Sequence, residues 1–184
     1  MIDITIILIA VLAVVVLYVI FVYNNLNQSK VRIKEAHSGI EVQMKRRADL
    51  VPNLVNTVKG YATHESGVFE RVSEAREKML SAQGVKQEAE ANNMLTESLK
   101  SIFAIAENYP DLKASQNFGS LQTELSDIEA KISYARQFYN NTVTAYNMVI
   151  VSFPSNLIAS IFNFKSEEFF DAEEGIEKPV EVKF

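Results

Sequence analysis

The sequence of 184 residues predicts an all-α protein, in which an N-terminal transmembrane helix continues into an antiparallel bundle of about four long helices. Two observations lead to this prediction. The stretch from Ile4 to Tyr23 is a run of twenty residues without a charge, and the remaining chain repeats apolar residues three and four positions apart. Glycine and proline are sparse, with six and four residues, and the period-two alternation typical of strands is missing.

The apolar segment 4–23 is predicted to cross a membrane. A helix of this length extends about 30 Å, which is the thickness of the hydrocarbon core of a bilayer. Tyr18 and Tyr23 lie toward its end, where aromatic rings favour the headgroup layer. The alternative is a cleaved signal peptide, but the segment has no basic region before it, exceeds the usual apolar length and precedes no small-x-small cleavage site.

The charges that flank the span predict its orientation. Residues 1–3 carry no side-chain cation, whereas Lys30, Arg32 and Lys34 follow the span closely. The positive-inside rule therefore predicts a single-pass cell-membrane protein with its N-terminus outside and its bundle domain in the cytoplasm. The three cations are candidate contacts for lipid headgroups, with a solvated helix face as the equal alternative. The net charge of −5 argues against a nucleic-acid partner.

We expect four segments along the chain: an extracytoplasmic N-terminus (1–3), the span (4–23), a helical-bundle domain (24–164) and an acidic C-terminal tail (165–184). The sequence contains no cysteine, so disulfides are excluded and cysteine usage does not indicate whether the protein faces an oxidising or a reducing compartment.

The first helix is predicted to run from the membrane to about residue 62, with a kink or a short restart near Asp49, because Pro52 lacks a backbone donor and crowds the preceding turn. A second helix is expected at about 67–82, capped by Ser66. A third is expected at about 87–108, with Met94 among its inward residues, and Pro110 breaks the chain after it.

The fourth helix shows the clearest pattern, a heptad seam sustained over four heptads. Its seam residues are Leu121, Leu125, Ile128, Ile132, Ala135, Tyr139, Thr142, Tyr146, Val149 and Phe153. Pro154 is predicted to end this helix, and Ser155 to cap a short last helix at 156–162.

The sequence offers little for catalysis. His37 and His64 are the only histidines, and neither the metalloprotease nor the diiron-bundle spacing occurs. There is no cysteine nucleophile, and the scattered glycines form neither a phosphate loop nor a dinucleotide fingerprint. We therefore expect no enzymatic activity, no cofactor and no metal.

One arginine falls at an apolar position. Arg47 shares the seam register of the first helix, where a guanidinium must be paired or extend to water. We expect an interhelix polar network that joins it to residues on or beside the seam of the fourth helix, namely Glu124, Glu129, Arg136, Tyr139 and Tyr146. The alternative is a polar docking site for a partner.

Several blocks of sequence resemble the LemA family. They are Arg46–Val55 with Val58–Ala62 and His64-Glu65, Tyr109–Ala114 with Asn117-Phe118, a set of residues between Leu121 and Asn147, and Phe153–Asn156. The resemblance implies a bacterial membrane protein with one N-terminal span and a cytoplasmic bundle of long helices. It supplies no catalytic residue. The resemblance also implies kinship with a group of proteins in magnetosome-forming bacteria that is associated with building membrane compartments. Other members of the family are associated with envelope stress and with a membrane metalloprotease.

Together these features predict a membrane-anchored, non-catalytic structural protein that self-associates into a homo-oligomer and organises or shapes the membrane. Its partners would be the lipid bilayer and further copies of itself. The alternative function is a cytoplasmic-facing adaptor or regulator of an envelope-stress or membrane-protease system. An enzyme would need an arrangement that the sequence does not reveal.

Overall fold

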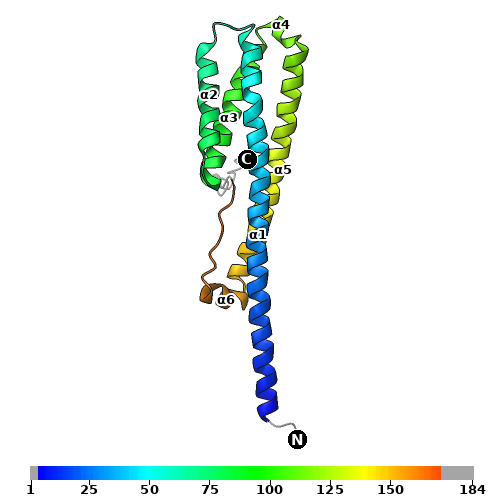
Figure 1. Cartoon of the computed structure of the whole chain (residues 1–184), viewed down its shortest axis with the longest axis vertical. Coiled ribbons are helices and arrows are strands. Elements are labelled where there is room, and N and C mark those ends of the chain that lie inside the picture. Colours follow the sequence, from blue (N-terminus) through cyan, green and yellow to red (C-terminus); the bar gives the residue numbers. More distant parts are fainter. Residues whose placement is uncertain (1–3, 171–184) are drawn as a thin grey trace, which may run out of the picture. The chain divides into compact units, whose positions relative to one another are not determined.

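The computed structural model describes residues 4–170 and forms two compact units. The described chain contains helices and no strand, which confirms the all-α prediction. The helices are α1 (Ile4–Lys59), α2 (Ser66–Ser81), α3 (Val85–Ala106), α4 (Pro110–Lys113), α5 (Gln116–Val151) and α6 (Ser155–Ile161) (Figure 1). Of the described residues, unit 1 holds 4–39 and 137–168, and unit 2 holds 40–136 with 169 and 170.

Unit 2 is a helical bundle built from α2, α3, α4 and the parts of α1 and α5 that belong to it. Each long helix turns one apolar stripe inward, as its spacing predicts. The fully buried side chains of this core include Ile40, Val51, Leu54, Val58, Val72, Leu95, Ile102, Leu112 and Ile132. Packing of these stripes provides the main stabilisation of the unit, because burial of apolar surface is the dominant favourable term in folding.

Pro52 does not end α1, which continues to Lys59. Proline has no N–H, so the carbonyl of Ala48, four residues earlier, loses its helical donor. The side chain of Arg76 on α2 replaces that donor, with Nε 2.8 Å from the Ala48 carbonyl oxygen. Ala48 itself is fully buried, where an unpaired carbonyl would be costly. A contact between two helices therefore compensates for the proline, and the expected restart near Asp49 does not occur.

The inward face of α3 differs from the prediction at one position. Met94 is exposed, whereas Asn92 and Leu95 are buried. The buried residues Glu88, Asn92, Leu95, Leu99, Ile102 and Ala106 follow each other four and three apart, so a polar asparagine occupies a core register. Apolar character alone selected Met94, but its neighbour Leu95 holds the seam and Met94 lies about 100° away on the helix.

The helix ends also differ in detail. Ser66 and Ser155 are the first residues of α2 and α6 and make no side-chain cap, and α4 is an additional short helix after Tyr109. Because α5 ends at Val151, the heptad register no longer applies to Phe153, which is 81% exposed.

Unit 1 contains the N-terminal part of α1, the C-terminal part of α5 and α6. Most of α1 up to Phe21 is exposed, while Val22 and Leu26 are buried. The ring of Tyr23 packs on Phe162 and Phe164, with centroids 4.8 and 5.8 Å apart. Figure 1 shows α6 beside α1, with the N-terminal part of α1 extending beyond it.

Candidate functional site

Arg47 is the centre of a buried polar cluster in unit 2. Its side chain is 5% exposed, and its Nη1 donates to Asn92 Oδ1 and to Thr96 Oγ1, each at 3.0 Å. Its Nη2 lies 2.8 Å from Glu129 Oε2 on α5, whose side chain is 40% exposed. The arginine therefore joins three helices, α1, α3 and α5, through one planar group that offers several donors.

The electrostatics of the cluster follow from its burial. Desolvation lowers the pKa of Arg47, and the charge of Glu129 partly opposes this shift by favouring the protonated form. The Arg47–Glu129 contact is an ion pair without the alignment of a hydrogen bond. Among the described residues, Arg47 Nε and Glu129 Oε2 therefore have no hydrogen-bond partner. The cluster supports a structural ion pair better than a proton-transfer site, because a guanidinium stays charged at neutral pH.

A cleft of about 800 Å³ opens beside this cluster, entirely within unit 2. Its lining combines apolar side chains with polar ones, among them Leu99, Phe103, Leu125, Thr96, Gln122 and Asp127, besides Arg47 and Glu129. Its volume falls within the range of small-molecule pockets. Because Arg47 and Glu129 are among its lining residues, the cleft gives another molecule access to the buried arginine.

The other residues of the predicted network lie elsewhere. Glu124 is exposed, and the guanidinium of Arg136 lies 5.5 Å from the ring centre of Phe170, which is a cation–π distance. Tyr139 and Tyr146 are both buried, and both belong to unit 1. The structure thus brings Arg47 and Glu129 together and gives the remaining residues different environments.

Tyr139 and Tyr146 hold a segment that we call the C-terminal strap, residues 165–168. The Tyr139 hydroxyl donates to the Glu168 carbonyl and the Tyr146 hydroxyl to the Lys165 carbonyl, each at 3.0 Å. Asn147 completes the attachment, donating to the Glu167 carbonyl and accepting from the Glu167 N–H, each at 3.0 Å. The first residues of the predicted acidic tail are therefore ordered on α5, and the rest of that tail lies outside the described residues.

The three cations after the apolar segment have different environments. Lys30 forms an ion pair with Glu167 of the strap at 3.4 Å, and both side chains are partly exposed. Arg32 and Lys34 are exposed on α1. All three remain candidates for lipid-headgroup contact.

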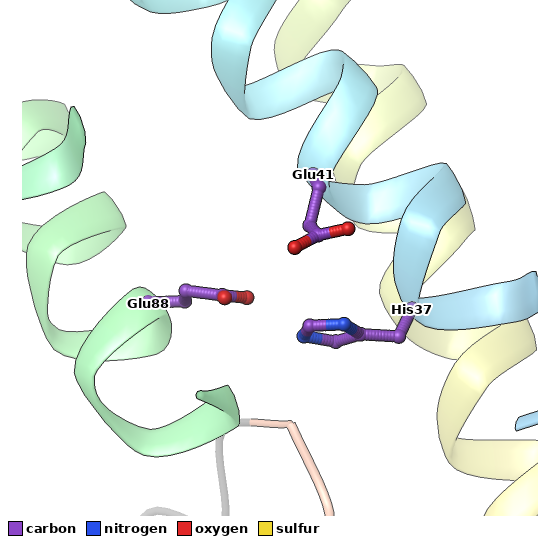
Figure 2. Close-up of side chains that lie close together, drawn as sticks. All are labelled: His37, Glu41 and Glu88. Atoms are coloured by element: carbon purple, nitrogen blue, oxygen red, sulfur yellow. The ribbon is translucent and has the colours of Figure 1, made fainter. Parts of the chain in front are cut away.

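Glu41 on α1 and Glu88 on α3 form a carboxylate pair in unit 2, with ligand oxygens within 4.8 Å of each other. His37 lies one helical turn before Glu41 on α1, and Figure 2 shows the three side chains. Carboxylates and imidazole are metal-ligand types. Each of the three residues already takes part in an interaction, so none is free. Spacing along the sequence does not indicate Glu88 as a neighbour of Glu41, because the two residues come from different helices.

In the described part of the chain, α1 is the one helix long and apolar enough to cross a membrane, and its most apolar window is not buried at all. The apolar segment and the helical bundle together define a membrane-associated protein of the helical-bundle class. The chain belongs to the LemA family, whose sequence model matches residues 36–184.

Curated relatives agree with this assignment. Magnetosome protein MamQ 2 of Paramagnetospirillum magneticum is 24% identical over 184 residues, covering 86% of this chain and 68% of its own length. Magnetosome protein MamQ of Magnetospirillum gryphiswaldense is 25% identical, covering 78% of this chain and 62% of its own length. Protein LemA of Metamycoplasma hominis is 26% identical, and the alignment covers 91% of this chain and 78% of that protein.

Proposed function

We propose that the chain is a membrane-anchored, non-catalytic structural protein that self-associates into a homo-oligomer and organises or shapes the membrane. The anchor is the apolar segment 4–23, and we propose that its N-terminus lies outside and the rest of the chain in the cytoplasm. Two of the relatives are named as magnetosome proteins, and this likeness supports a structural role for this chain as well.

The observation that carries self-association is a second stripe of α5, on the face opposite its buried seam. Tyr134, Phe138 and Met148 are 73%, 53% and 61% exposed, and Asn141 and Ala145 between them are exposed as well. These five residues, the outer α5 stripe, follow each other four, three, four and three apart. That spacing is typical of a helix that packs against another helix. A second copy of the same helix is the occupant that a symmetric interface would supply.

Mass measurement of the full chain tests this proposal. We expect the chain to elute from a size-exclusion column in mild detergent as a homo-oligomer, and the Phe138→Glu/Met148→Glu variant to elute as a smaller species. Ser133→Glu/Thr144→Glu is the matched control with the same number of new charges, because both residues are exposed on α5 but lie about 100° around the helix from the neighbouring stripe residues Tyr134 and Ala145. A wild-type monomer at high protein concentration would overturn the proposal.

Orientation has its own test. The sequence contains no cysteine, so Lys100→Cys introduces a unique thiol at a side chain that is 67% exposed. We expect a membrane-impermeant thiol reagent to label this variant only after the cells are opened. Labelling in intact cells would reverse the proposed orientation.

The cleft beside Arg47 favours the second candidate, an adaptor or regulator of an envelope-stress or membrane-protease system. In that function a partner would insert a side chain between α3 and α5. In-cell crosslinking from a photoreactive residue placed at Gln122 in the cleft or, in a second variant, at Phe138 on the outer α5 stripe separates the two functions. A single stoichiometric partner and little self-crosslinking would favour the adaptor, and self-crosslinking from the outer α5 stripe alone would favour the structural protein.

A further inference from the structure

A second uncharged stretch of the chain lies far from the N-terminal span. The sequence from Gln137 to Phe164 contains twenty-eight residues without a charged side chain. Its last part includes α6 and the preceding turn, where Phe153, Leu157, Ile161 and Phe162 are 81%, 55%, 76% and 46% exposed. The opposite side of α6 is also apolar, with Ile158 and Ala159 buried. Exposed apolar side chains gathered on one short helix and the turn before it are expected to be covered by another apolar surface.

The position of α6 in unit 1 indicates what covers it. Phe162, which follows the last turn of α6, packs on Tyr23, and Tyr23 is the last residue of the apolar segment. Tyrosine at the end of a span lies at the level of the headgroups, so α6 lies at that level too. Figure 1 agrees, because the apolar part of α1 extends beyond α6 on one side only.

Polar contacts mark the aqueous side of the same unit. Lys30 pairs with Glu167 of the C-terminal strap at 3.4 Å. Lys30 follows Tyr23 by seven residues of helix, which is about 10 Å. The exposed apolar surface of α6 is thus located between the hydrocarbon core and the first ion pair, a depth that matches the interfacial layer.

We propose that α6 and Phe153 form a second, interfacial membrane contact that inserts the side chains of Phe153, Leu157, Ile161 and Phe162 into one leaflet. The partner is the lipid surface at the C-terminal end of the span. This contact rests on the membrane anchor of the proposed function and not on self-association. It adds apolar volume to a single leaflet, which a transmembrane helix alone does not do.

Lipid-depth quenching of a single tryptophan tests the proposal, because the natural sequence contains none. The full chain is reconstituted in vesicles with phosphatidylcholine that carries bromine near the top of one acyl chain. We expect bromolipid to remove roughly half or more of the emission of Phe153→Trp and Ile161→Trp, since interfacial helices bury their apolar face about 5–10 Å into the headgroup boundary. Phe138→Trp, which lies about 20 Å along α5 before the end of that helix at Val151, is the unquenched control.

Each other outcome overturns the proposal in a recognisable way. Unquenched, red-shifted emission from Phe153→Trp and Ile161→Trp would show that α6 faces water, and unquenched, blue-shifted emission would show a protein cover such as a second copy. Leu17→Trp lies about 9 Å before Tyr23 in the span and reports the span itself at the depth of the bromine, so its failure to be quenched would overturn the membrane anchor along with α6. Leu157→Trp replaces either variant if circular dichroism shows that it does not fold.

Discussion

Arg76 donates to the carbonyl that Pro52 leaves without its helical donor, so the two positions should be energetically coupled. Arg76→Met keeps much of the side-chain bulk and removes the donor that lies 2.8 Å from the Ala48 oxygen. A buried carbonyl left unpaired costs about 2 kcal/mol. In a Pro52→Ala background the restored N–H at position 52 reaches the same oxygen along the helix, so Arg76→Met should cost about 0.5 kcal/mol, mostly from lost packing. The same packing loss applies in the natural background and cancels, so the expected interaction energy is the cost of the unpaired carbonyl, about 2 kcal/mol.

Thermal unfolding of the full chain in mild detergent, followed by circular dichroism, measures this double-mutant cycle. For a chain of this size about 2 kcal/mol corresponds to a Tm shift of roughly 4–8 °C, so the effects of Arg76→Met in the natural and the Pro52→Ala backgrounds are readily distinguished. Arg71→Met is the control, because Arg71 is exposed on the same helix. If Arg76→Met lowers Tm equally in the two backgrounds, the compensation between helix and proline is refuted.

Three further predictions use the same unfolding assay. Arg47→Ala should destabilise the chain by about 2–3 kcal/mol, since it leaves Asn92 and the partly exposed Glu129 without their partner and leaves the volume of the side chain empty. Arg47→Met should cost less, about 1 kcal/mol, because methionine fills much of that volume. A Tm that rises in Arg47→Met would contradict a stabilising network. Gly84 has a φ of 81°, so Gly84→Ala should lower the free energy of unfolding by about 1–2 kcal/mol. Gly39 lies inside α1 with open space around it, so Gly39→Ala should raise the free energy of unfolding by about 0.5–1 kcal/mol. Tm shifts of the same sign in the two variants would be evidence against this backbone argument. Burial, together with the charge of Glu167, raises the pKa of Tyr146 above its ordinary 10.0, so the folded state keeps this proton longer than the unfolded state. The contribution of this tyrosine to the free energy of unfolding is therefore constant below pH 10 and falls as the pH rises above that value. Tyr146→Phe should weaken the decline of Tm at alkaline pH. An unchanged decline would exclude this tyrosine as its cause.

Helical periodicity predicts the long helices well because each one buries a single stripe. The seam of α5 is buried at Leu125, Ile128, Ile132, Tyr139 and Tyr146. Periodicity says nothing about which polar group takes a core position on a neighbouring helix. Asn92 was missed for that reason, although its place in the register of Leu95 and Leu99 was a readable signal.

The burial of Arg47 follows from its register, but its partners do not. Asn92 and Thr96 lie 45 and 49 positions further along the chain, and only tertiary packing brings them to the guanidinium. Pro52 illustrates the same limit in the opposite direction. Local rules predict a break at a proline, and a side chain from α2 provides the missing donor.

The strap 165–168 is attached to α5 through main-chain carbonyls and one main-chain N–H, and the side chain of Glu167 adds an ion pair with Lys30 on α1. Every residue type has these main-chain groups, except that proline lacks the N–H. Substitutions within residues 165–168 should therefore leave this portion of the polypeptide attached to α5. Proline at position 167 is the exception, because it would remove the N–H that donates to Asn147.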